Sequence, residues 1–187
     1  SDFQCPFCSR LATTFDELEQ TYGRDLRFVF RHNPLPFHDR AEPAAQLSLE
    51  AFARLGHRGF WQAHDRIFAQ PRQLEDADLE QIAADLGLSP QRTLQAVARR
   101  KHRKRIEADQ AWAGKLNARG TPTSYVNGRK VVGARPAADF ESVIDEELAK
   151  ARALVAQGVP PHGIYARLQR GAELPPPPDQ KPPAPTP

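Results

Sequence analysis

The sequence lacks methionine, has only two cysteines and contains no long apolar run among its 187 residues. Since translation begins with methionine, we expect the translated chain to start upstream of Ser1. A membrane-spanning helix needs about 18 or more consecutive apolar residues, and no segment approaches that length. With 40% hydrophobic and 26% charged residues, the composition is that of an ordinary globular protein, which excludes a wholly disordered chain.

Proline is distributed unevenly along the chain. Ten of the 18 prolines lie between residues 158 and 187, which leaves eight for residues 1–157. A segment as long as residues 1–157 suffices for one globular domain with a sizeable core. We expect residues 158–187 to form a short helix followed by a proline-rich linker, because proline runs favour an extended conformation that buries little apolar surface.

Positive charge is concentrated in residues 99–105. This segment holds six of the 26 basic residues, and without it the net charge of +3 becomes 20 basic against 23 acidic residues. A basic run can contact nucleic acid, but this one lies in a predicted helix, lacks interleaved aromatic residues and has no nucleic-acid-binding motif around it. We therefore expect a solvent-facing helix surface and no nucleic-acid partner.

Hydrophobic periodicity and turn residues predict an alternation of helices and strands. Apolar residues recur every three or four positions from Phe7 to Tyr22, which is typical of an amphipathic helix. The Asn127-Gly128 pair favours a tight hairpin between two short strands. The predicted helices cover residues 6–22, 39–55, 59–69, 76–86, 89–117 and 136–158, and the predicted strands cover residues 26–30, 123–126 and 129–132. This order indicates an α/β fold, an open mixed sheet with helices on its faces.

The two cysteines stand three residues apart in Cys5-Pro6-Phe7-Cys8, at the start of the first predicted helix. Cys5 falls at the N-cap, where unpaired N–H groups and the helix dipole favour a thiolate. Pro6 suits the first helical position because it has no N–H to leave unpaired. The asymmetry predicts Cys5 as the attacking thiolate and Cys8, one turn further and more buried, as the resolving thiol.

Two other roles for these cysteines are weaker. A zinc site would need further ligands such as His32 and His38, but the chain has no second cysteine pair and these histidines are six residues apart. A purely structural disulfide would close so short a loop that it would constrain the unfolded chain little. We therefore expect no metal and no cofactor.

Three segments together carry a family resemblance: residues 1–8 with the cysteine pair, residues 30–38, and residues 120–128 with Gly120-Thr121-Pro122-Thr123 ahead of the hairpin. In their order and spacing they resemble the thioredoxin superfamily, and within it the DsbA-like thiol-disulfide oxidoreductases. The 116 residues between Cys5 and Pro122 are similar to the DsbA pattern, in which a helical domain, here at about residues 39–118, is inserted into a thioredoxin-like domain covering residues 1–157.

The resemblance implies a function and a site. Cys5 and Cys8 would exchange a disulfide with cysteine-containing protein substrates and with a redox partner protein, without a cofactor. Pro122 would be cis and pack against the cysteine pair, Thr121 would offer its backbone to an extended substrate peptide in a β-augmentation mode, and Phe7 would contact the substrate. DsbA-like proteins work in oxidising compartments, so the bacterial cell envelope or periplasm is the expected location.

Several features depart from the family or leave alternatives open. Asp2 is either a proton acceptor near Cys8 or a residue at the end of a strand. The family's central first strand precedes this position, so we expect it to be missing from this chain or to be supplied by another molecule. The main alternative to an enzyme is a thioredoxin-fold docking or redox-sensing module within a longer chain, with additional domains. A same-fold conjugating enzyme, which uses serine in place of the first cysteine, is disfavoured by the two intact cysteines.

Overall fold

The computed structural model describes residues 1–70 and 74–169. Within these residues the chain is mainly helical and contains one β-hairpin. The elements are α1 (Pro6–Tyr22), a 3-10 helix η1 (Gly23–Asp25), α2 (Ala41–Ala69), α3 (Asp76–Asp85), α4 (Pro90–Ala98), α5 (Arg103–Lys115), β1 (Thr123–Val126), β2 (Arg129–Val132), α6 (Ala137–Ala156) and α7 (Pro161–Gln169).

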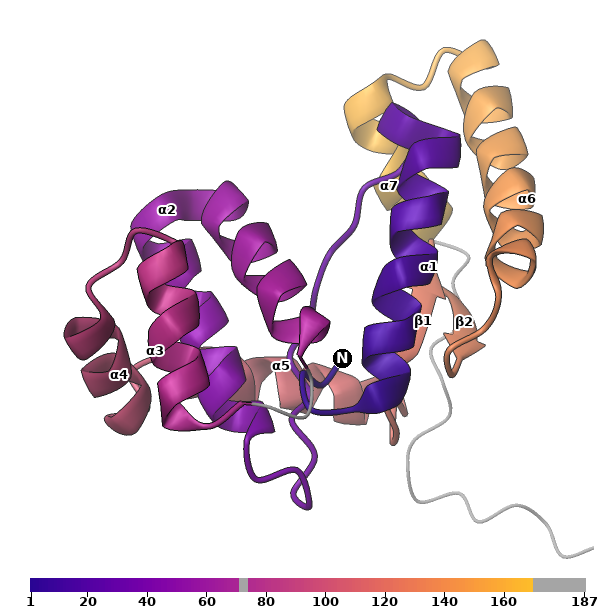
Figure 1. The fold of residues 1–187 in the computed structure, drawn as a ribbon. Coiled ribbons are helices and arrows are strands. Elements are labelled where there is room, and N and C mark those ends of the chain that lie inside the picture. Colours follow the sequence, from indigo (N-terminus) through magenta and orange to yellow (C-terminus); the bar gives the residue numbers. More distant parts are fainter. Residues whose placement is uncertain (71–73, 170–187) are drawn as a thin grey trace, which may run out of the picture.

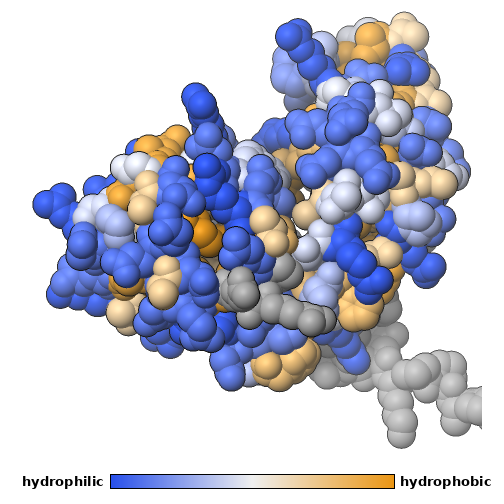
Figure 2. All heavy atoms as spheres, in the orientation of Figure 1, coloured by the Kyte–Doolittle hydropathy of each residue, from blue (hydrophilic) through white to orange (hydrophobic). Residues whose placement is uncertain are grey.

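The elements form two lobes (Figure 1). Helices α2, α3 and α4 make up the helical lobe, whereas α1, the hairpin, α6 and α7 make up the hairpin lobe, and α5 leads from the first to the second. Hydrophilic side chains cover most of both lobes on the face shown in Figure 2. No helix in the described part of the chain is long and apolar enough to cross a membrane.

Helix α1 belongs to the cores of both lobes. Leu11 and Leu18 pack with Phe140 and Ile144 of α6 in the core of the hairpin lobe. The first turn instead joins the core of the helical lobe, which contains both cysteines together with buried side chains of α2 and α3. The predicted amphipathic stripe therefore exists, and the cysteine pair sits where the two cores meet.

The predicted strand at residues 26–30 is wrong. These residues are extended, but they form no ladder, because a strand needs a hydrogen-bonded neighbour and the only sheet among the described residues is the antiparallel pair β1–β2. The side chains pack without a sheet: Phe30 stacks on Phe3 with ring centroids 5.0 Å apart, and Phe28 contacts Phe15 at 5.2 Å. No strand precedes α1 in the described residues, so the expected mixed sheet is represented by the hairpin alone.

The helices expected at residues 39–55 and 59–69 are the two arms of α2, which kinks at Gly56. This glycine has φ 69° and ψ −157°, a conformation essentially restricted to glycine. The first arm begins at Ala41 with Arg40 as its N-cap, one residue later than the predicted N-cap Asp39.

The single helix predicted over residues 89–117 is also wrong, since the chain breaks between α4 and α5 and Arg100 has φ 49°. Tertiary contacts with α2 stabilise the break. Three polar residues of α2 bind it: Glu42 accepts hydrogen bonds from Arg100, Gln46 accepts one from the main-chain N–H of His102, and Glu50 contacts Lys101 and the His102 ring. Part of the basic run is therefore paired with α2, not simply solvated.

The hairpin is confirmed. Thr123 pairs with Val132 and Val126 with Arg129, and both turn residues, Asn127 and Gly128, have positive φ as the Asn-Gly signal predicts. The short helix expected after Pro161 is α7, which ends at Gln169. The proline-rich segment beyond it lies outside the described residues, so the division at residue 158 stays a prediction.

Candidate active site

Cys5 lies at the N-cap of α1 as predicted, with φ −76° and ψ 120°, and Pro6 occupies the first helical position. The Cys5 carbonyl accepts hydrogen bonds from the main-chain N–H groups of Cys8 and Ser9 at 3.0 and 3.2 Å. The side chain is a free thiol that is only 4% exposed. The positive end of the α1 helix dipole lies at this N-cap.

Cys8 is a second free thiol, one turn into α1 and 2% exposed. Burial raises the pKa of the Cys8 thiol above its ordinary value, because the charged form loses its hydration. The Cys8 sulfur accepts a hydrogen bond from the main-chain N–H of Asp2 at 3.4 Å. A buried thiol that resists ionisation suits a resolving cysteine better than an attacking one.

Thr121 and Pro122 directly precede β1, and the main chain of Thr121 contacts Cys5. Their peptide bond is cis, as the resemblance implies. The Cys5 sulfur lies 3.5 Å from the carbonyl oxygen of Thr121, although the two residues are 116 positions apart. The Pro122 carbonyl accepts a hydrogen bond from Gly133 at 2.9 Å, which ties this segment to the end of β2. The hydroxyl of Thr121 is buried and has no hydrogen-bond partner, so the side chain contributes no polar contact here.

Asp2 lies beneath the cysteine pair, and its side chain is fully buried. One carboxylate oxygen accepts the main-chain N–H groups of Gln4 and Cys5 at 2.8 and 3.2 Å. The other accepts the main-chain N–H of Leu35 at 2.8 Å and contacts Nδ1 of His38 at 2.8 Å. The hydrogen bond between Asp2 and Cys8 is made by the Asp2 main-chain nitrogen, not by its carboxylate. The role of Asp2 as a proton acceptor therefore stays a prediction.

Phe7, between the two cysteines, is half exposed. The guanidinium of Arg10 lies over its ring at 4.5 Å from the centroid, a cation–π arrangement. An exposed aromatic ring beside the cysteine pair offers apolar contact area to an incoming chain, and the substrate contact of Phe7 stays a prediction.

His32 and His38, the two residues considered as zinc ligands, face different surroundings. His38 binds Asp2, whereas the His32 ring is buried against the rings of Phe3, Phe30 and Phe60. Burial lowers the pKa of His32 to about 3, because the protonated ring would lose its hydration there. His32 is therefore a neutral core residue at ordinary pH.

The structural link from Asp2 to His38 was not found from the sequence. The two residues are 36 positions apart, and His38 carries no local signal that pairs it with a carboxylate. Gln4 was also missed; its side-chain oxygen accepts the main-chain N–H of Arg40 at 2.8 Å. Both contacts join the segment before Cys5 to the loop before α2.

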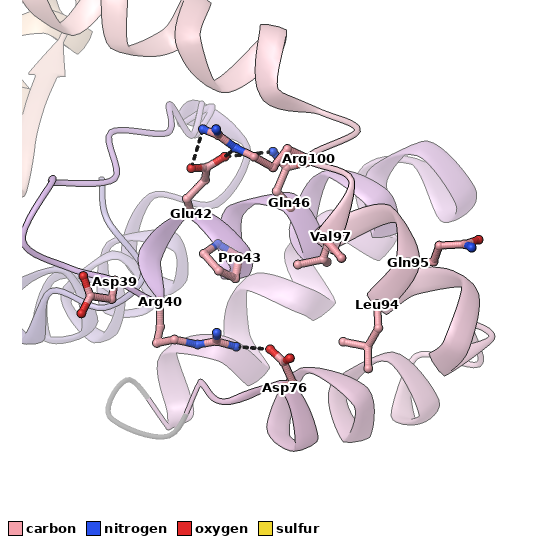
Figure 3. Close-up of a pocket in the computed structure, with 11 residues that line it drawn as sticks. Asp39, Arg40, Glu42, Pro43, Gln46, Asp76, Leu94, Gln95, Val97 and Arg100 are labelled. Atoms are coloured by element: carbon pink, nitrogen blue, oxygen red, sulfur yellow. Dashed lines mark hydrogen bonds and ion pairs between the residues drawn. The ribbon is translucent and has the colours of Figure 1, made fainter.

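A cavity of about 710 Å³ lies elsewhere, in the helical lobe between the start of α2 and helix α4 (Figure 3). Two arginines on its rim are each paired with a carboxylate: Arg40 with Asp76 at 2.5 Å and Arg100 with Glu42 at 2.6 Å. Neither cysteine lines this cavity, so it is separate from the thiol site.

Comparison with known proteins gives a consistent family. A family model described as thioredoxin matches residues 1–146. The chain is 35% identical over 144 residues to the Na(+)/H(+) antiporter NhaA of Herminiimonas arsenicoxydans, covering 77% of this chain and 22% of that protein. It is 32% identical over 176 residues to NhaA 3 of Salinispora tropica, covering 94% and 26%. The chain thus spans about a quarter or less of the length of these curated relatives.

Two solved structures share the fold. A periplasmic thioredoxin-like protein from Salmonella enterica serovar Typhimurium superimposes with a TM-score of 0.63 at 21% sequence identity, covering 80% of this chain and 81% of that one. The oxidoreductase DsbA from Xylella fastidiosa gives a TM-score of 0.60 at 24% identity, covering 79% and 83%. Unlike the antiporters, both are matched over most of their length.

Proposed function

The chain belongs to the thioredoxin family and has a DsbA-like fold, and from this premise we propose that it is a thiol-disulfide oxidoreductase that exchanges a Cys5–Cys8 disulfide with cysteines of extended protein substrates. The observation that carries the proposal is the position of the Cys5 sulfur, at the N-cap of α1 and 3.5 Å from the Thr121 carbonyl. A nucleophile and a main-chain acceptor for a peptide strand thus lie side by side.

The exchange proceeds in two balanced steps. A substrate thiolate attacks the Cys5 sulfur of the oxidised pair, which forms a mixed disulfide and releases Cys8 as a thiolate that takes up a proton. A second substrate thiolate then attacks the substrate sulfur of the mixed disulfide and releases Cys5 as a thiolate. The substrate dithiol loses two electrons and two protons; the cysteine pair gains the two electrons, Cys8 takes one proton and the other goes to solvent. The reverse sequence reduces a substrate disulfide.

The substrate binds as an extended chain beside Thr121 and Pro122. Main-chain groups of Thr121 pair with the peptide, and the exposed ring of Phe7 contacts apolar side chains. Main-chain pairing tolerates many sequences, which fits a protein that acts on diverse cysteine-containing substrates and on one redox partner protein. The periplasmic solved neighbour supports a location in the bacterial cell envelope.

The catalytic unit in this proposal is residues 1–157, with the helical insertion at about residues 39–118, and residues 158–187 serve as a short helix and linker. The test uses two cysteine variants of the full chain. Cys5→Ser should abolish insulin reduction and peptide oxidation, whereas Cys8→Ser should accumulate mixed disulfides with substrate, visible on non-reducing gels. Equal melting temperatures of the two variants control for folding. Full activity of Cys5→Ser would contradict the proposal.

A second candidate is a redox-sensing or docking module within a longer chain. It is supported by the relatives, in which the matching segment makes up 22–26% of a protein named as an Na(+)/H(+) antiporter. In that case the Cys5–Cys8 pair would report the redox state to attached domains instead of turning over substrates. A cysteine pair that equilibrates with glutathione yet neither oxidises nor reduces protein substrates would favour the module over the enzyme.

A further inference from the structure

A buried carboxylate contacts both the segment before Cys5 and the loop before α2. Asp2 is the residue that joins them, and all four of its acceptor contacts lie between 2.8 and 3.2 Å. Three of the donors are main-chain N–H groups, which can only donate, and one of these belongs to Cys5 itself. The Cys5 N–H also faces the main-chain carbonyl of Asp2 at 3.3 Å, so the carboxylate, which a second loop holds in place, and the Asp2 backbone together orient the Cys5 backbone.

His38 is the one side chain among these four donors. Its Nδ1 lies 2.8 Å from the Asp2 oxygen that also accepts the N–H of Leu35. Carboxylate oxygens act as acceptors, so the His38 tautomer that fits this contact carries its proton on Nδ1 and donates it. The ring is 19% exposed and packs edge-on against Phe37, with centroids 4.7 Å apart. His38 therefore closes the Asp2 site from the solvent side.

On this geometry, and resting on the proposed function, we infer that His38 is a positioning residue for the disulfide exchange: through the buried Asp2 carboxylate it holds the Cys5 backbone at the N-cap of α1. His38 does not touch the reacting sulfurs. It donates a hydrogen bond to the carboxylate and orients it, the carboxylate in turn orients the N–H of Cys5, and this holds the sulfur against the Thr121 carbonyl.

The arrangement has an electrostatic consequence for the reduced state. A buried carboxylate that loses one of its donors is less well compensated, and its negative charge acts more strongly on a thiolate nearby. The reduced form with a Cys5 thiolate is then less stable relative to the disulfide. Because a stable reduced form makes a strong oxidant, loss of the His38 donor should make the protein a weaker oxidant.

The test compares three substitutions in the full chain. His38→Leu removes the donor. His38→Asn keeps an N–H at the position of Nδ1, because the Asn amide nitrogen is the same number of bonds from the backbone. His38→Gln is the matched control, since its amide lies one bond further out, at the place of the other ring nitrogen. The first readout is the equilibrium constant for exchange with reduced and oxidised glutathione.

We expect His38→Leu to shift this equilibrium about five- to tenfold toward the disulfide form, the effect of about one ordinary hydrogen bond. His38→Asn should restore the wild-type value and His38→Gln should not. An unchanged equilibrium in His38→Leu, even with a lower melting temperature, would overturn the inference, because a purely structural residue destabilises both redox forms equally. If His38→Leu does not fold, the exchange equilibria of His38→Asn and His38→Gln are compared instead: a wild-type value for Asn and a shifted value for Gln support the inference, and equal values contradict it.

A second measurement separates this inference from the proposed function. The rate at which iodoacetamide alkylates Cys5, measured in the Cys8→Ser background, needs no substrate turnover. If the wild type exchanges no disulfide, the proposed function fails. The alkylation rate of Cys5 then tests the positioning role of His38 on its own. A slower rate in His38→Leu that His38→Asn restores supports the positioning role, and equal rates in all variants refute it.

Discussion

The sulfur of Cys5 lies 3.5 Å from the main-chain oxygen of Thr121, which brings the first turn of α1 against the segment that enters the hairpin. The contact involves the Thr121 backbone, and the hydroxyl of the same residue is buried without a partner. Since the contact uses only the Thr121 main chain, the Thr121 hydroxyl can be removed while the Cys5–Thr121 contact is kept.

We therefore predict that Thr121→Val retains substrate turnover within about twofold and leaves the free energy of unfolding equal or up to about 1 kcal/mol higher, because it removes an unsatisfied buried hydroxyl. Insulin reduction and denaturant unfolding are the measurements. Thr123→Val is the matched control: its hydroxyl donates to the Gly120 carbonyl at 2.7 Å, so its loss should cost about 1 kcal/mol. A large loss of turnover in a folded Thr121→Val would assign a role to the hydroxyl.

The buried ring of His32 predicts a pH dependence of stability. Its pKa in the folded protein is about 3, lowered by burial, whereas in the unfolded chain it is about 6.5. Between these values only the unfolded chain binds the proton, so stability falls as the pH falls below about 6.5. Denaturant unfolding should show His32→Phe gaining about 2 kcal/mol relative to the wild type between pH 7 and pH 5.

The exposed His162 provides the control for this experiment. His162→Phe should leave the difference from the wild type constant over the same pH range, since its ring remains in water in both states. Parallel stability curves for His32→Phe and the wild type would show that the buried ring accepts a proton in the folded protein.

Glu50 predicts a second, more acidic transition. Burial by itself would raise the pKa of Glu50, but hydrogen bonds from Lys101, Arg54 and His102 outweigh it and lower the pKa to about 2. The stabilisation is present above the unfolded value of about 4.3 and is lost as the pH falls toward about 2. Between pH 6 and pH 3 the advantage of the wild type over Glu50→Gln should shrink by about 2 kcal/mol in denaturant unfolding.

A control on the same helix separates burial from charge pairing. Glu42 pairs with Arg100, but both side chains are considerably more exposed than Glu50. Glu42→Gln should therefore change stability by less than about 1 kcal/mol at any pH. If the two glutamine variants respond alike to acid, the buried cluster around Glu50 does not control stability.

Two glycines, one at the kink in α2 and one inside α5, predict opposite effects of substitution by alanine. Gly56 has φ 69°, and a Cβ there would meet no atom within 4 Å, so Gly56→Ala should cost about 1–3 kcal/mol through backbone strain alone. Gly114 lies within α5, and its Cβ would also meet no atom within 4 Å. Gly114→Ala should gain about 0.5–1 kcal/mol. Thermal and denaturant unfolding check both, and a neutral Gly56→Ala would mean that α2 straightens without cost.

The sequence allowed the prediction of features that depend on short-range patterns. Pro6 after Cys5 marked the start of α1, and Asn127-Gly128 marked the hairpin turn. Helix ends and tight turns are determined by residues a few positions apart, so short sequence patterns are enough to predict them. The cysteine pair and the Thr121-Pro122 segment were also identified, since each is a recognisable motif in its own right.

Features that depend on distant partners were missed. Residues 26–30 have the composition of a strand, but a ladder needs a neighbouring strand, and none lies beside them among the described residues. The break before α5 has no glycine or proline; Glu42, Gln46 and Glu50 of α2 stabilise it from more than 50 positions away. The Asp2–His38 contact was missed for the same reason. Side-chain pairing across the fold leaves no local pattern.

The contact between Cys5 and Thr121 has a consequence for the order of events during synthesis. Cys5 is made 116 positions before Thr121, which follows only after the whole of α2 to α5 has been made. Domains acquire structure as the ribosome releases them, so the helical lobe is available to fold before the second half of the site exists. Until the hairpin segment is made, the Cys5 thiol lacks the Thr121 carbonyl that lies beside it in the folded protein. The nascent chain therefore carries this thiol without the segment that we propose selects substrates.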